Sequence, residues 1–257
     1  MTVDTNLARR AIGLLDLTSL NDDDTETVIQ RLCARARTPF GDVAAVCVYP
    51  RFVAAAKRFL RGSTVRIATV ANFPAGDSDV DRAVSETHAA IADGADEIDV
   101  VLPYRALLAG DRATPVTLVA ACKHACGAGR RLKVILEIGA LGTPERIAEA
   151  AQLAIQGDGD FLKTSTGKLQ PGATLLAARA MLEAIAEARS AGRRVGFKAA
   201  GGIRTAQQAA EYLALADEIM GDGWATKETF RFGASAILDD LLGFLDGAKP
   251  TAASGSY

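Results

Sequence analysis

The segment that decides the fold is Phe161-Leu162-Lys163-Thr164-Ser165-Thr166-Gly167, a short apolar run that ends in small polar residues and a glycine. Such a run is too short for a buried helix and is typical of a buried strand followed by a turn. Similar runs recur along the chain, each before an amphipathic stretch. They predict eight strands: Val43–Val48, Arg66–Asn72, Glu97–Val101, Leu132–Glu137, Phe161–Ser165, Val195–Ala199, Glu218–Met220 and Phe232–Ala234.

Helix-start signals stand between several of these strands. Thr143-Pro144 is typical of a cap and first helical residue, Thr205 with Gln208 forms a capping box, and Ser78 precedes a helical pattern over 80–92. Alternating strands and helices indicate a parallel sheet covered by helices, and eight repeats predict a closed (β/α)8 TIM barrel, an α/β fold. An open doubly wound sheet is the alternative, but no G-x-G-x-x-G motif follows the first predicted strand.

The 257 residues suit one barrel, and we expect a single domain over residues 1–246. The stretch Ala8–Arg37 predicts an extra N-terminal helix before the first strand, with the acidic residues 22–24 near its start. Residues 247–257 are rich in Ala, Ser and Gly and predict a flexible C-terminal tail.

Composition excludes several classes of protein. The net charge is −2, hydrophobic residues make up 49 %, and neither end carries a basic run, so we expect no nucleic-acid or membrane partner. No signal-like or membrane-spanning segment is present, which indicates a cytoplasmic protein. Four cysteines are too few for a disulfide framework. The only histidines, His88 and His124, lie in helical patterns outside any metal motif, so we expect neither a metal nor an organic cofactor.

Charged residues alternate with apolar ones inside the predicted strands. In the strand over 132–137, Leu132, Val134 and Leu136 share one face, which leaves Lys133 and Glu137 on the other. If the apolar face meets the helices, the charged face points into the barrel. The same alternation directs three further charged side chains inward: Lys163, Lys198 and either Glu97 or Asp99.

Two of these lysines end neighbouring strands, at the edge where barrel active sites form. Lys163 and Lys198 are therefore expected to lie close together. Each ammonium opposes protonation of the other, so one of the two is expected to be a neutral amine near neutral pH. A neutral amine attacks a carbonyl carbon, and Asp99 on a nearby strand is placed for proton transfer. The pattern predicts Schiff-base chemistry without deciding which lysine is the nucleophile.

Glycine-rich turns follow the later strands and offer backbone N–H groups to an anion. These turns are Gly167-Lys168, Gly201-Gly202 and Gly233-Ala234-Ser235, the last running straight into a helix. One such turn is common in any fold, but three beyond neighbouring strands favour a phosphate site. The predicted substrate is a phosphorylated carbonyl compound.

At these residues the sequence resembles the deoxyribose-phosphate aldolase family of class I aldolases, which are (β/α)8 barrels. The resemblance covers nearly the whole chain. It lies in ordered blocks at residues 16–20, 46–50, 70–74, 97–101, 133–137, 161–167, 196–198 and 231–235. Ala236 departs from the family pattern, because relatives carry a second serine there.

The resemblance implies a role for each matching residue. Lys163 is the implied Schiff-base lysine, Lys198 the neighbour that lowers its pKa, Asp99 the carboxylate that moves protons through a water, and Tyr257 a terminal tyrosine that assists proton transfer. The implied phosphate residues are Gly167, Lys168, Gly201, Gly202, Gly233 and Ser235, and the implied sugar-site residues are Asp16, Thr18, Leu20, Cys47, Lys133 and Thr166.

The family activity is the reversible cleavage of 2-deoxy-D-ribose 5-phosphate to D-glyceraldehyde 3-phosphate and acetaldehyde, a step of deoxyribonucleotide breakdown. The resemblance therefore implies small phosphorylated sugars and aldehydes as partners, no cofactor, and self-association, with a homodimer as the first assembly to test. Two alternatives remain open at this point. One is a transaldolase-like or isomerase barrel that uses the same lysines on another sugar, and the other is a non-catalytic barrel that binds a sugar phosphate.

Overall fold

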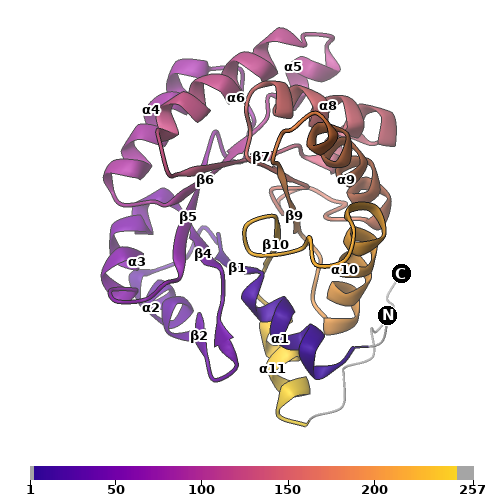
Figure 1. Ribbon diagram of the computed structural model, residues 1–257. Helices are drawn as coiled ribbons and strands as arrows, with labels where there is room; N and C mark the ends of the chain where they lie inside the picture. Colours follow the sequence, from indigo (N-terminus) through magenta and orange to yellow (C-terminus); the bar gives the residue numbers. More distant parts are fainter. Residues whose placement is uncertain (1–2, 248–257) are drawn as a thin grey trace.

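The computed structural model describes residues 3–247. Eight parallel strands close into a barrel in the order β1-β10-β9-β8-β7-β6-β5-β4, and helices surround it (Figure 1). This confirms the predicted TIM barrel, and the open-sheet alternative is wrong. The barrel strands are β1 (Leu15–Ser19), β4 (Ala45–Val48), β5 (Arg66–Ala71), β6 (Glu97–Val101), β7 (Arg131–Ile135), β8 (Phe161–Lys163), β9 (Gly196–Ala200) and β10 (Phe230–Ala234).

The helices mostly begin where the sequence places their caps. Thr143 caps α8, Thr205 and Gln208 form the capping box of α10, and α4 begins at Val80 but is capped by Asp79 instead of Ser78. The helices are α1 (Thr5–Gly13), α2 (Glu26–Arg35), α3 (Val53–Phe59), α4 (Val80–Ala92), α5 (Tyr104–Leu108), α6 (Ala113–Cys126), α7 (Ile138–Leu141), α8 (Pro144–Gln156), α9 (Leu175–Ser190), α10 (Ala206–Met220) and α11 (Ile237–Leu245). A 3-10 turn, η1 (Pro50–Phe52), and a hairpin of β2 (Arg37–Thr38) and β3 (Gly41–Asp42) complete the elements.

The first barrel strand lies inside the stretch that the sequence assigned to an extra helix. The predicted N-terminal helix exists as α1, which packs against α11 (Figure 1). The stretch Ala8–Arg37, however, also contains β1 and α2, so its assignment to one helix is wrong. The acidic residues do not cap α2, because Thr25 does so, and Asp24 instead accepts hydrogen bonds from the Ser19 hydroxyl and the Asn21 backbone N–H.

The predicted strand Glu218–Met220 is also wrong, because these residues form the last turn of α10. Met220 continues the buried stripe of this 15-residue helix, which ends at Met220 and is followed by Gly221 as its C-cap. The barrel still has eight strands, since β1 takes the place of the misassigned one.

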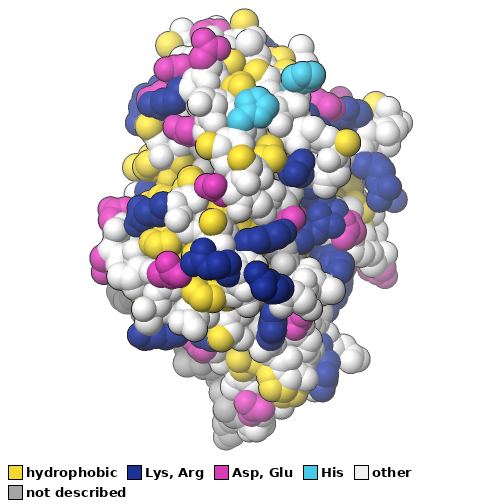
Figure 2. All heavy atoms as spheres, turned by 90° about the vertical axis from the view of Figure 1, so that its left-hand side faces the viewer, with side chains coloured by type: hydrophobic (Ala, Val, Ile, Leu, Met, Phe, Trp, Pro, Cys, Tyr) yellow, Lys and Arg dark blue, Asp and Glu magenta, His cyan; other side chains and the backbone are white. Residues whose placement is uncertain are grey.

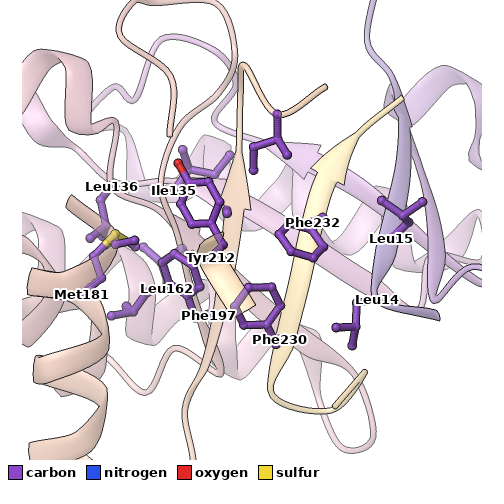
Figure 3. Packing of buried hydrophobic residues seen from close by; sticks show 14 of the residues in the cluster. Leu14, Leu15, Ile135, Leu136, Leu162, Met181, Phe197, Tyr212, Phe230 and Phe232 are labelled. Carbon is purple, nitrogen blue, oxygen red and sulfur yellow. The ribbon is translucent and has the colours of Figure 1, made fainter. Parts of the chain in front are cut away.

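The outer faces of the strands pack against the helices and form the main apolar core (Figure 3). Phe230 and Phe232 of β10 lie 4.9 Å apart between ring centroids, and Phe197 of β9 and Tyr212 of α10 pack beside them. Apolar residues thus face outward toward the helices, as strand alternation predicts. The inner face of the same strands is left for charged side chains.

The outer surface carries the two histidines, both exposed on the face shown in Figure 2. His88 lies on α4 and His124 on α6, which confirms their interpretation as helix-face residues. Within residues 3–247, no helix is long and apolar enough to span a bilayer. The predicted tail over 247–257 lies outside the described residues beyond Gly247.

Candidate active site

A cavity of about 620 Å³ opens at the carboxyl ends of the barrel strands. This is the end where barrel enzymes place their active sites. Ten residues singled out from the sequence line it: Thr18, Leu20, Lys163, Thr166, Gly167, Lys168, Gly201, Gly202, Gly233 and Ser235. The predicted pattern of lysine and glycine turns is thus brought to one place.

Lys163 and Lys198 are direct neighbours in the barrel. They face each other across β8 and β9 in the strand register, and both amines donate to the same oxygen of Asp99. The distances to Asp99 Oδ2 are 2.9 Å from Lys163 Nζ and 2.8 Å from Lys198 Nζ. The expected proximity of the two lysines and Asp99 is confirmed by these contacts.

The two lysines differ in what else they touch. Lys198 is fully buried and also donates to Asp16 Oδ2 at 2.5 Å, whereas Lys163 lies at the cavity and is 3 % exposed. Burial by itself lowers the pKa of Lys198, but the carboxylates of Asp16 and Asp99 outweigh it and raise that pKa well above its ordinary value. Lys198 therefore stays cationic, and Lys163 is the lysine that a ligand can reach.

Below the lysines the barrel is filled by further buried charges. Lys133 Nζ lies 2.7 Å from both Glu97 Oε2 and Asp99 Oδ1. Arg231 donates to both oxygens of Glu97, at 2.8 and 3.1 Å, and to Asp16 Oδ1 at 2.5 Å. Glu97 and Asp99 both point into the barrel, whereas the sequence predicted that one of the two would do so. Two residues apart on one strand, they share a face.

The seven side chains form one connected group, which we call the interior charge cluster. Burial raises the pKa of Asp99, but Lys133, Lys163 and Lys198 outweigh it and hold that pKa well below its ordinary range. The pKa values of Asp16 and Glu97 are lowered in the same way by neighbouring cations. The cluster contains three carboxylates and four cationic side chains: Asp16, Glu97, Asp99, Lys133, Lys163, Lys198 and Arg231.

The glycine turns form the rim of the cavity. Gly167, Gly201 and Gly202 have φ values of 82°, 92° and 85°, a left-handed region that favours glycine. Gly233 and Ser235 line the cavity and lead into α11, which begins two residues after Ser235. The Lys168 amine donates to the Leu20 carbonyl oxygen at 2.8 Å, which holds it across the rim. Backbone N–H groups, a helix start and a cation together suit an anion.

Other predicted residues lie behind the cavity wall. Asp16 and Lys133 belong to the interior charge cluster, and Cys47 packs in a small apolar group with Leu20 and Val70. Burial raises the pKa of the Cys47 thiol, so it is a neutral neighbour of the cluster. None of these three lines the cavity. Tyr257 lies outside the described residues.

Sequence analysis missed several residues of the site. Arg204 follows the Gly201-Gly202 turn and lines the cavity, as do Arg31 and Arg35 of α2. A cation two residues beyond a predicted anion-binding turn was the available signal for Arg204. Arg231 was also missed as a charge partner, because it lies at the start of a strand and its burial depends on Glu97 from a distant part of the chain.

The remaining cysteines and carboxylates do not form a metal site within the described part of the chain. No group of three or more His, Cys, Asp or Glu side chains there is arranged to hold a metal ion. Cys122 and Cys126 are buried on α6. All four cysteines are free thiols.

Known proteins resemble this chain over nearly its whole length. A candidate deoxyribose-phosphate aldolase from Toxoplasma gondii ME49 is 25 % identical with a TM-score of 0.84, covering 95 % of this chain and 96 % of its own. One from Coccidioides immitis is 31 % identical with a TM-score of 0.78, covering 91 % and 85 %. A tetrameric deoxyribose phosphate aldolase from Aeropyrum pernix, 23 % identical over 93 % and 91 % with a TM-score of 0.73, shares the fold.

The family model of the DeoC/LacD aldolases matches residues 10–241, which contain every barrel strand and the cavity described above. The chain belongs to the DeoC/LacD family of aldolases.

Proposed function

We propose that this aldolase cleaves 2-deoxy-D-ribose 5-phosphate reversibly to D-glyceraldehyde 3-phosphate and acetaldehyde through a Schiff base on Lys163. The observation that carries the proposal is the position of Lys163, whose amine lies at the cavity and shares an Asp99 oxygen with the permanently charged Lys198. The relatives of 25 % and 31 % identity described as candidate deoxyribose-phosphate aldolases support the choice of substrate.

The charges of the interior cluster support Lys163 as the nucleophile. Within the cluster the four cations outnumber the three carboxylates, so the cations compete for carboxylate partners. Lys133, Lys198 and Arg231 each contact at least two carboxylates, whereas Lys163 contacts Asp99 alone. Lys163 is therefore the cation with the fewest carboxylate partners, and as a neutral amine it would attack a carbonyl carbon.

The reaction then follows from the position of that amine. Lys163 Nζ adds to the C1 aldehyde, and loss of water gives an iminium ion. The iminium accepts the electron pair of the C2–C3 bond as that bond breaks, while the C3 hydroxyl loses its proton, and D-glyceraldehyde 3-phosphate leaves. The resulting enamine takes up a proton at C2, and hydrolysis releases acetaldehyde and the free amine. Asp99, a carboxylate in the resting site, holds Lys198 beside the reacting nitrogen and exchanges protons with the reacting atoms by way of a water molecule.

The rim of the cavity supports a phosphorylated substrate. We assign the phosphate to the turns at Gly167, Gly201, Gly202 and Gly233, with Lys168 and Ser235 as side-chain donors. Thr18, Leu20 and Thr166 then flank the sugar between the rim and Lys163. We expect a role in deoxyribonucleotide breakdown in the cytoplasm. A homodimer remains the first assembly to test.

Borohydride trapping tests the proposal. Treatment with deoxyribose 5-phosphate and borohydride should reduce the iminium to a stable amine, and peptide mapping should place the adduct on Lys163. Borohydride without the sugar is the control. An unmodified Lys163 beside a modified Lys198 would contradict the assignment. Turnover should persist in EDTA, and cleavage of fructose 6-phosphate in preference to deoxyribose 5-phosphate would favour the transaldolase-like alternative.

A further inference from the structure

Glu137 is a buried carboxylate that the proposed mechanism does not use. It is fully buried and forms no ion pair with any residue between 3 and 247. It follows β7 with a φ of 60° and precedes α7, so the chain holds it in a left-handed conformation that is uncommon for a glutamate. Burial of a carboxylate without an ion-pair partner costs free energy, so the position of Glu137 must be explained by its other contacts.

Both oxygens of Glu137 bind one residue, Thr166 on the cavity wall. The Thr166 hydroxyl lies 2.5 Å from Glu137 Oε2, and the Thr166 backbone N–H donates to Oε1 at 3.3 Å. The Lys168 backbone N–H donates to Thr166 Oγ1 at 3.0 Å. Glu137 itself does not line the cavity, so any effect on a ligand passes through Thr166.

These contacts determine which way the Thr166 hydroxyl points. A hydroxyl has one hydrogen to donate and two lone pairs to accept with. The hydroxyl donates its hydrogen to Glu137 Oε2, and the Lys168 N–H occupies one lone pair. The remaining lone pair is the part of the hydroxyl left for the cavity.

We propose that Glu137 is a positioning residue that makes Thr166 a hydrogen-bond acceptor toward the cavity, so that the site selects a ligand whose hydroxyl donates there. The inference rests on the proposed function in taking the ligand to be a hydroxylated phosphate ester. It assigns to Glu137 a part in substrate selection: a ligand that lacks a hydroxyl donor at this point leaves the Thr166 lone pair unpaired.

The variant Glu137→Gln tests the direction of this hydrogen bond at nearly constant volume. The Thr166 backbone N–H can only donate, so the glutamine oxygen takes the place of Oε1. Its NH2 group then faces Thr166 Oγ1 and donates to it. The hydroxyl must turn its hydrogen toward the cavity, and Thr166 becomes a donor to the ligand.

Binding of two unreactive ligands measures the consequence. Glycerol 3-phosphate can donate from its C2 hydroxyl, whereas the C2 fluorine of its 2-fluoro analogue cannot donate; the two share the C1 hydroxyl and the phosphate, and neither has a carbonyl for Lys163. By calorimetry the wild-type enzyme should prefer the hydroxyl compound about tenfold. Glu137→Gln should reduce the preference to about one, as should Thr166→Val. Thr166→Ser keeps the hydroxyl and should retain the wild-type preference.

Inorganic phosphate separates positioning from a merely structural role. Its affinity should be the same in the wild type and Glu137→Gln, because the phosphate rim is unchanged. Equal loss of affinity for both glycerol ligands and for phosphate would overturn the inference, as would a wild-type preference near one or a tenfold preference that survives Glu137→Gln. If the ratio changes as expected but deoxyribose 5-phosphate is not cleaved, the proposed function fails and the positioning role stands.

Discussion

The barrel interior has an upper half next to the cavity and a lower half away from it. Both hold charged side chains, which differ in their exposure to the cavity and in their number of carboxylate partners. In the lower half, Arg231 and Lys133 are sealed from solvent and each pairs with two or more carboxylates. In the upper half, Lys163 reaches the cavity and has one carboxylate, which Lys198 shares. The lower half is thus built for stability and the upper half for reactivity. Removing a charged side chain should therefore lower the stability of the protein when it lies in the lower half, and the activity when it lies in the upper half.

The largest expected effect is the loss of activity in Lys163→Met. Without the amine no Schiff base forms, so turnover of deoxyribose 5-phosphate should fall by more than about 1,000-fold. Asp99 keeps Lys133 and Lys198 as partners, so no buried charge is left alone, and the free energy of unfolding should change by less than about 1 kcal/mol. Steady-state kinetics and urea unfolding measure the two. Residual activity above that level would show that another group is the nucleophile.

Arg231→Met should show the reverse balance. The change removes three charge-assisted hydrogen bonds, two to Glu97 and one to Asp16, and although both carboxylates keep Lys133 nearby, the free energy of unfolding should fall by about 2–3 kcal/mol. Urea unfolding measures it, with Arg58→Met as the control, because Arg58 forms an exposed pair with Glu26. A loss no larger than that of the control would contradict the structural role of the lower half.

Acid should weaken the interior charge cluster. The folded-state pKa values of Asp16, Glu97 and Asp99 are lowered by neighbouring cations, so their stabilising effect is present above the ordinary carboxyl range near pH 4. It is lost as the pH falls from there through the folded-state values. Urea midpoints should be flat from about pH 5 to 8 and drop steeply below about pH 4.

The variant Arg231→Met provides the matched comparison for this pH dependence. Without Arg231, the pKa values of Asp16 and Glu97 move back toward the unfolded ones, so the drop in stability below pH 4 should be shallower than in the wild type. Asp77→Asn, in an exposed pair, should leave the wild-type profile unchanged. Parallel profiles for Arg231→Met and the wild type would show that acid acts elsewhere.

The two halves also differ in how far the sequence predicts them. Lys163 and Lys198 stand in strongly apolar strands beside glycine turns, so alternation alone brings them inward and together. The first strand was missed because Asp16 interrupts its apolar run and α1 ends only two residues before it. The burial of Asp16 is offset by its ion pair with Arg231, which lies 215 residues away in the sequence. No local sequence pattern contains such a pairing. Long-range electrostatics is what the sequence leaves undetermined.

The smallest effect is expected at Ala236, on the rim of the upper half, where the resemblance to the family implies a serine. Ala236 lines the cavity and has a helical φ of −65°, so a serine there cannot adopt the extended backbone of a usual N-cap and should leave the melting temperature unchanged. Its hydroxyl would add one donor to the proposed phosphate site, and Ala236→Ser should bind inorganic phosphate about threefold more tightly by calorimetry. Ala54→Ser, on the exposed face of α3, is the control. Unchanged phosphate affinity in Ala236→Ser would place the anion away from the start of α11. This small difference in affinity therefore tests where the rim of the cavity binds the phosphate.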